Sequence, residues 1–132
     1  AFNLPHKNAD FKWLLADGEN DKAKNRIVIS RTPKVQGNHI FWEFQIRPKA
    51  DQCLFVGLPK EHEIFEYALG YKVEYLPVSN ALELAVHINN CAMFIGNQSL
   101  PHAIAEGLKK PIIIEVGNYP AAVFKREGAV YI

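Results

Sequence analysis

Two short polar segments of this 132-residue sequence carry the residue types that bind anions. Each segment directly follows an apolar stretch. Guanidinium, ammonium, hydroxyl and amide groups all donate hydrogen bonds to phosphate oxygens, and the charged donors give the strongest of these bonds. The two segments therefore predict a site for a phosphate-bearing ligand. Its candidate ligands are Arg31, Thr32 and Lys34 in the first segment, and Gly96, Asn97, Gln98 and Ser99 in the second.

The second segment leads into a predicted helix over residues 100–109, with Pro101 near its start. Proline suits the first turn of a helix, where a backbone N–H has no intrahelical partner. The other free N–H groups of that turn, with the positive end of the helix dipole, can hold an anion. An alternative is that Asn97 or Ser99 only caps the helix.

Two further candidates, His102 and Glu106, lie four residues apart on that helix and share one of its faces. Glu106 can accept hydrogen bonds from ribose hydroxyls, and His102 can donate to a phosphate or act as an acid. The alternatives are a solvated or paired carboxylate and a surface or capping histidine. The other four histidines have no ligand spacing with one another, so no metal site is predicted, and the sequence assigns no catalytic residue.

Short strands alternating with helices are the elements that must position these residues. Four apolar runs, rich in β-branched or aromatic residues, indicate strands that are covered on both faces. A fifth run alternates more and ends at a proline, which favours a place near a sheet edge. The strands are expected at 26–30, 53–57, 72–76, 92–96 and 111–116, and the helices at 61–69 (closed by Gly70), 80–89 (capped by Ser79 or Asn80) and 100–109.

This alternation predicts the fold class α/β, a Rossmann-like open parallel sheet with helices on both faces. The expected strand order, 3-2-1-4-5, places the first strand beside the fourth, and the two polar segments follow these two strands. Open sheets bind ligands at this point, outside the carboxyl ends of the strands. Neither segment carries a glycine-rich dinucleotide fingerprint or a Walker motif, which argues against a standard NAD site and a P-loop nucleotide hydrolase.

The chain is expected to divide into an N-terminal arm, residues 1–25, and the domain itself, residues 26–132. In the arm, Trp13 and Leu14 are expected to pack against the sheet edge. A short last strand is expected over 129–132.

The sequence does not decide how much of the connection between the first two strands, residues 33–49, is helical. Gly37, Asn38 and Pro48 interrupt its periodicity. Its buried face is expected to come from Phe41, Trp42, Phe44 and Ile46.

Composition and charge exclude several classes of protein. The chain is 48% hydrophobic and 22% charged, which is typical of one globular domain and excludes wholesale disorder. Its 15 basic and 14 acidic residues give a net charge of +1, so a nucleic-acid or membrane-surface partner is not expected. No apolar run reaches the roughly 20 residues that cross a bilayer, and the start has no apolar signal core, which indicates a soluble, cytoplasmic protein.

Cys53 and Cys91 lie in apolar stretches without CxxC or zinc-ligand spacing, so both are predicted to be buried thiols. The chain has no initiator Met, its single Met being Met93, and is expected to be a piece of something longer.

Residues 94–111, Phe-Ile-Gly-Asn-Gln-Ser-Leu-Pro-His-Ala-Ile-Ala-Glu-Gly-Leu-Lys-Lys-Pro, resemble the nucleotide-diphosphate-sugar site of the ADP-heptose lipopolysaccharide heptosyltransferases, glycosyltransferases of the GT-B fold. The family pattern is a strand, the residues G-N-D-S-G-P, a helix, and a proline before the next apolar strand. The turn over 31–34, with Trp42 beyond it, is similar to the family's diphosphate-contacting loop, and the whole resemblance covers about 85 residues in order. Gln98 stands where the family has an acidic residue, and Leu100 where it has glycine.

The resemblance implies the C-terminal, donor-binding half of a GT-B glycosyltransferase. Such a half binds a nucleotide-diphosphate sugar without a further cofactor, and Arg31, Thr32 and Lys34 would neutralise the departing diphosphate. The family's acceptor site and general base lie in an N-terminal half, which a missing domain or a partner chain would supply. Alone, the chain is therefore expected to bind the donor and turn over little.

The alternative function is a free-standing or degenerate module that binds nucleotides or anions, or that mediates protein contacts. A response-regulator-like or flavodoxin-like domain is disfavoured, because the loop after residue 29 carries Arg31 and Lys34 instead of acidic residues.

Overall fold

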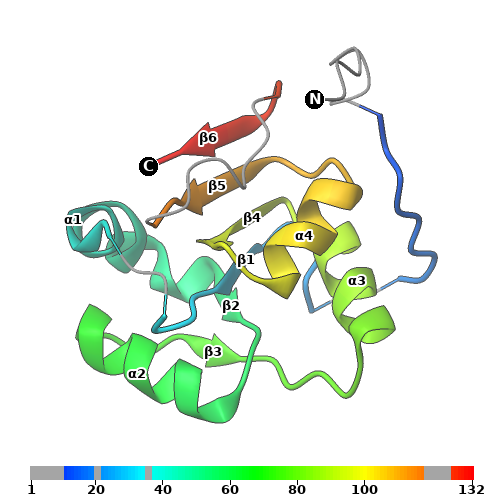
Figure 1. Cartoon of the computed structure of the whole chain (residues 1–132). Coiled ribbons are helices and arrows are strands. Elements are labelled where there is room, and N and C mark those ends of the chain that lie inside the picture. Colours follow the sequence, from blue (N-terminus) through cyan, green and yellow to red (C-terminus); the bar gives the residue numbers. More distant parts are fainter. Residues whose placement is uncertain (1–10, 20–21, 35–36, 118–125) are drawn as a thin grey trace.

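The computed structural model describes residues 11–19, 22–34, 37–117 and 126–132. Within them, six parallel strands form one sheet in the order β3-β2-β1-β4-β5-β6 (Figure 1). The α/β class and the expected pairing of the first strand with the fourth are confirmed. The expected last strand lies beside β5. The strands are β1 (Ile27–Ser30), β2 (Cys53–Phe55), β3 (Glu74–Tyr75), β4 (Met93–Asn97), β5 (Ile112–Glu115) and β6 (Ala129–Tyr131).

The pairing of β1 with β4 brings the two polar segments together. Val28 pairs with Phe94, and Ser30 pairs with Gly96, so the two strands end at the same level of the sheet. Both strands are almost entirely buried, which explains why they read as unbroken apolar runs.

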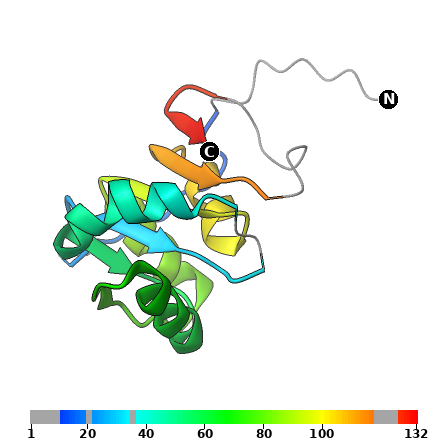
Figure 2. The same ribbon diagram turned by 90° about the vertical axis from the view of Figure 1, so that its left-hand side faces the viewer.

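Helices cover both faces of the sheet (Figures 1 and 2). On one face, α3 (Ala81–Asn90) and α4 (Leu100–Gly107) pack on a core that includes Val28, Leu54 and Phe94. On the other face, α2 (Pro59–Leu69) and the helical connection after β1 pack on Ile29, Phe55 and Ile95. Neighbouring residues of one strand thus belong to opposite cores, as the period of two in a strand requires.

The helix ends follow the expected chemistry. The side chain of Asn80 caps α3 by accepting a hydrogen bond from the Glu83 N–H at 2.9 Å, so Asn80 and not Ser79 is the cap. Gly70 ends α2 in the left-handed conformation, at φ 66°, which a glycine adopts without strain.

The connection between β1 and β2 is helical over most of its length. It begins with α1 (His39–Phe41), continues as a π-helical turn (Trp42–Ile46) and ends in 3₁₀ turns (Arg47–Gln52). Trp42 and Ile46, four residues apart, are buried on the sheet, whereas Phe41 is half-buried and Phe44 is 66% exposed. The expected buried face is therefore correct for two of its four residues.

The N-terminal arm packs on the end of α4 and not on the sheet edge. The N–H groups of Trp13 and Leu14 donate to the Gly107 carbonyl at 3.1 and 3.0 Å. A Cβ on Gly107 would lie 2.9 Å from atoms of both residues, so the arm fits here because the helix carries a glycine. The sheet-edge expectation for Trp13 and Leu14 was wrong, and residues 1–10 of the arm lie outside the described residues.

Cys53 and Cys91 are free and buried, as predicted, and burial raises the pKa of each thiol to about 11. Among the described residues, none of the helices has the length and apolar character to cross a membrane. The same residues contain no group of three or more side chains able to hold a metal ion.

Candidate functional site

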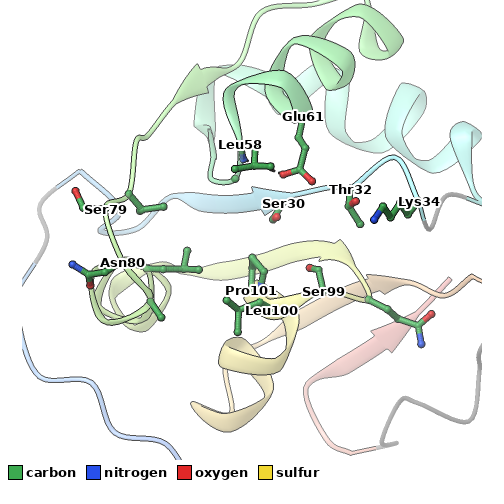
Figure 3. Close-up of a pocket in the computed structure, with 15 residues that line it drawn as sticks. Ser30, Thr32, Lys34, Leu58, Glu61, Ser79, Asn80, Ser99, Leu100 and Pro101 are labelled. Atoms are coloured by element: carbon green, nitrogen blue, oxygen red, sulfur yellow. Dashed lines mark hydrogen bonds between the residues drawn. The ribbon is translucent and has the colours of Figure 1, made fainter.

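A pocket of about 530 Å³ lies at the carboxyl ends of the central strands, between the first turns of α2, α3 and α4 (Figure 3). This is where the strand order reverses between β1 and β4, the place at which open α/β sheets bind ligands. The pocket is lined by Ser30, Thr32, Lys34, Gly57, Leu58, Glu61, Val78, Ser79, Asn80, Ala81, Leu84, Gln98, Ser99, Leu100 and Pro101.

The pocket has two walls and two chemically different ends. Figure 3 shows Leu58 and Glu61 on one wall, facing Leu100 and Pro101 on the other. The end near β1 is polar, because four of the expected site residues line it. The other end, between the starts of α2 and α3, is mainly apolar, with Ser79 and Asn80 as its polar residues (Figure 3). The four polar residues are Thr32, Lys34, Gln98 and Ser99, and the apolar lining includes Leu58, Val78, Ala81, Leu84, Leu100 and Pro101.

The first turn of α4 begins at the pocket. Ser99 is its N-cap residue in extended conformation, and its hydroxyl donates to the Asn97 carbonyl at 3.0 Å without capping the helix. The first intrahelical bond runs from the Ala103 N–H to the Ser99 carbonyl, so the N–H groups of Leu100 and His102 precede it, and Pro101 has none. This helix end presents donors and the positive end of a dipole to the pocket.

Gly96 and Asn97 are buried beside the pocket and hold its floor together. A Cβ on Gly96 would lie 2.4 Å from the Ser30 carbonyl oxygen, so only glycine allows β1 and β4 to pair here. The Asn97 side chain accepts from the Thr32 N–H at 3.0 Å and donates to the Thr32 carbonyl at 2.7 Å. These two expected site residues thus align the two polar segments without lining the pocket.

Arg31 does not line the pocket, contrary to the expectation that it faces a diphosphate. Its guanidinium, 3% exposed, donates from Nε and Nη2 to the two oxygens of Glu115, each at 2.8 Å. The same guanidinium lies 5.0 Å from the ring centre of Trp42. The side chain that directly follows β1 therefore turns toward β5, where a fully buried carboxylate needs a cation.

Glu115, at the end of β5, accepts five hydrogen bonds. Besides the two from Arg31, they come from the N–H groups of Gly37 at 2.6 Å and Asn38 at 2.7 Å, and from the Trp42 Nε1 at 3.1 Å. Burial disfavours the charged form of Glu115, but the hydrogen bonds from Arg31, Gly37 and Asn38 outweigh it and lower the pKa of its carboxyl to about 2.

The low pKa of Glu115 predicts acid sensitivity. Because the pKa is about 4.5 in the unfolded chain and about 2 in the folded one, the charged carboxylate stabilises the fold above pH 4.5, and this contribution is lost as the pH falls toward 2. The full contribution is about 3 kcal/mol. Urea denaturation should show that the difference in unfolding free energy between wild type and Glu115→Gln shrinks below pH 4.5. A difference that stays constant from pH 7 to pH 3 would contradict this assignment.

His102 and Glu106 also lie away from the pocket. Glu106 accepts from Arg126 Nε at 2.8 Å and from Lys109 Nζ, so it is the paired carboxylate that the sequence left as an alternative. His102 is buried, its Nε2 has no hydrogen-bond partner within the described residues, and burial lowers the pKa of its ring. Neither side chain is among those that line the pocket.

Sequence reasoning did not assign Glu61 and Glu115. Glu61 enters the pocket wall from the first turn of α2, and its Oε2 accepts from the Leu58 N–H at 3.0 Å. A sequence signal existed for Glu115, the one charge in the apolar run 111–116, because a charge inside a strand buried on both faces requires a buried partner.

Comparison with known proteins bears on the fold. No protein-family model matches the sequence, and no curated protein matches it significantly. Among solved structures, the E. coli heptosyltransferase WaaC with ADP-2-deoxy-2-fluoro heptose is 16% identical, with a TM-score of 0.63 over 86% of this chain and 38% of that chain. The dodecameric iron-containing heptosyltransferase TibC in complex with ADP-D-beta-D-heptose is 13% identical, with a TM-score of 0.57 over 89% of this chain and 33% of that chain.

The chain has the fold of part of a heptosyltransferase. This likeness confirms the α/β fold class and the heptosyltransferase-like architecture expected from residues 94–111. The chain spans 38% of the length of WaaC and 33% of the length of TibC.

Proposed function

We propose that this chain binds the nucleoside diphosphate of a sugar donor in the pocket between α2, α3 and α4, as the donor-binding part of a glycosyltransferase. One observation carries the proposal: the pocket joins a polar end, at Lys34, Thr32 and Ser99, to an apolar end, at Leu58 and Leu84. A nucleoside diphosphate has the same two parts, a charged diphosphate and a flat base with large apolar faces.

The diphosphate is assigned to the polar end. Lys34 supplies the cation, and the hydroxyl groups of Thr32 and Ser99 supply neutral donors, that of Ser99 by turning from the Asn97 carbonyl to the phosphate. The Leu100 N–H group at the start of α4 adds a backbone donor, together with the positive end of the helix dipole. The expected contribution of Arg31 is left out, because its guanidinium is paired with Glu115.

The nucleoside is assigned to the other end. Leu58 and Pro101 face each other across the pocket and can enclose the base (Figure 3). Glu61 uses one carboxylate oxygen for the Leu58 N–H and keeps acceptor capacity for ribose hydroxyls. Glu61 takes the role that the sequence gave to Glu106, because Glu61 lines the pocket and Glu106 is paired with Lys109 and Arg126.

In this proposal the chain assists the loss of the nucleoside diphosphate from the anomeric carbon. Negative charge grows on the departing phosphate as the glycosidic bond breaks, and Lys34 with the α4 helix end stabilises that charge. The acceptor and the base that removes its proton come from a second domain or a partner chain. The isolated chain therefore binds donor and turns it over slowly.

Two further observations support the proposal. The two solved structures reported above are heptosyltransferases, one with ADP-2-deoxy-2-fluoro heptose and the other in complex with ADP-D-beta-D-heptose. Cys53 and Cys91 are unpaired, which fits the reducing cytoplasm, the location expected from the sequence.

Replacing Ser99 with alanine should weaken binding of a nucleoside diphosphate by about 1 kcal/mol, or about five-fold, because one neutral hydrogen bond is lost. Titration calorimetry measures the change, with the matching nucleoside as the control that should bind equally to both proteins. An equal loss for nucleoside and diphosphate would show that Ser99 acts through the fold.

Titration calorimetry of the unmodified chain against ADP, UDP, GDP and CMP tests the proposed function and identifies the base. We expect at least one nucleoside diphosphate to bind with a dissociation constant of about a millimolar or tighter, because the pocket is already formed. No binding by any nucleotide at that concentration would refute the proposal and favour the interaction module.

A further inference from the structure

We infer that Glu115, a residue outside the pocket, positions Lys34 for the diphosphate by holding both ends of the loop that carries it. The inference rests on the proposed function and deepens it. We call residues 31–34 and 37–38 the Lys34 loop. No residue of β5 lines the pocket, so Glu115 acts through this loop and is a positioning residue.

The carboxylate binds the Lys34 loop on both sides of Lys34. At the start of the loop it accepts two hydrogen bonds from Arg31, and at the end it accepts the N–H groups of Gly37 and Asn38. The distances, 2.6 to 2.8 Å, are those of charge-assisted bonds. One buried side chain therefore fixes two points of the chain between which Lys34 stands.

Two other contacts make this arrangement stiff. The Trp42 Nε1 donates to the same carboxylate at 3.1 Å, and the Trp42 ring lies against the Arg31 guanidinium. From the β4 side, Asn97 holds the backbone of Thr32 through both its N–H and its carbonyl. The Lys34 loop is thus held from β4 and from β5, and Lys34, which is exposed, projects from it toward the pocket.

Only a carboxylate satisfies this set of donors. Five N–H groups converge on the two oxygens of Glu115, whereas a glutamine has one carbonyl oxygen and adds two donors of its own. Glu115→Gln keeps the size of the side chain but leaves N–H groups at the loop ends without an acceptor. The variant should release the loop and Lys34, and leave the nucleoside end of the pocket, at Leu58 and Leu84, in place.

The test compares wild type, Glu115→Gln and the control Glu66→Gln by titration calorimetry. Glu66 is a matched control because it also accepts a backbone N–H, that of Val73 at 2.9 Å, and lies outside the pocket. The probes are the tightest-binding nucleoside diphosphate among ADP, UDP and GDP, and its nucleoside. We expect Glu115→Gln to weaken binding of the diphosphate about ten-fold and binding of the nucleoside less than about two-fold. Glu66→Gln should change neither affinity.

A second readout needs no ligand. The amide protons of Gly37 and Asn38 should exchange slowly in wild type and in Glu66→Gln, and faster in Glu115→Gln. Should Glu115→Gln fail to fold, Glu115→Asp takes its place, because the shorter side chain keeps the charge but withdraws it from the loop. The same losses of diphosphate affinity and of amide protection are expected. Fast exchange of both amides in the wild-type chain would overturn the inference.

The binding results separate the inference from the proposed function. Suppose that wild type binds a diphosphate. If the folded Glu115 variant binds it equally well, or if its affinities for nucleoside and diphosphate fall to the same extent, the positioning role of Glu115 is refuted and the proposed function stands. If wild type binds none of the nucleotides, the proposed function fails and the positioning role fails with it.

Discussion

Replacing Arg31 with methionine is expected to lower the free energy of unfolding by about 3–5 kcal/mol, because it leaves Glu115 as a buried charge without its cation. Arg31 and Glu115 are 3% and 0% exposed, and two hydrogen bonds of 2.8 Å join them. Methionine fills much of the volume of the arginine stem but supplies no donor. Urea denaturation at pH 7 measures the change.

An exposed ion pair supplies the control. Arg26 donates to Glu74 at 2.7 Å, but the Glu74 side chain is 54% exposed, so Glu74→Gln should cost less than about 1 kcal/mol. Losses of similar size for Arg31→Met and Glu74→Gln would contradict the view that the Arg31–Glu115 pair is a buried anchor of the fold.

Replacing Lys34 with alanine is expected to weaken nucleoside diphosphate binding by about 1.5–3 kcal/mol, at least ten-fold, and to leave nucleoside binding unchanged. The reason is that Lys34 is the cation assigned to the diphosphate end of the pocket. The loss should shrink as salt rises, since an exposed charge is screened over about 8–10 Å at ordinary ionic strength. Calorimetric titrations at low and high salt provide the measurement.

Lys60→Ala is the matched control for Lys34→Ala. Lys60 lies in the first turn of α2 near the pocket, is 78% exposed and pairs with Glu63 at 3.3 Å, but it does not line the pocket. This variant should bind the diphosphate like wild type. If both lysine variants lose affinity equally, the effect comes from overall charge and not from a contact made by Lys34.

The fold was predictable because its strands carry their own signals. Residues 26–30 and 92–96 are short apolar runs covered on both faces, and helical patterns between strands require parallel crossovers. These two facts predict a doubly wound sheet, whose usual strand order, 3-2-1-4-5, places β1 beside β4 and the polar residues after Ser30 and Gly96 at one edge of the sheet. The position of the pocket followed from topology alone.

The contacts of the individual side chains were less predictable, because the sequence does not show which distant residues pack beside each of them. Arg31 has a pocket on one side and Glu115 on the other, and 84 residues separate it from that partner. Glu106 similarly meets Arg126, 20 residues away. Glu61 lines the pocket because the loop after β2, which leads into α2, ends beside the loops that follow β1 and β4. Such partners emerge from packing and not from local spacing.

Binding at this pocket is tested by nuclear magnetic resonance of the isotope-labelled chain, titrated with the tightest-binding nucleoside diphosphate. The largest chemical shift changes are expected at the backbone amides of Lys34, Glu61, Ser99 and Leu100, which come from three separate segments and meet at the pocket. Shifts concentrated on other residues, such as those of α4's far end and β6, or no shifts at millimolar nucleotide, would contradict the claim that this pocket binds the diphosphate of a sugar donor.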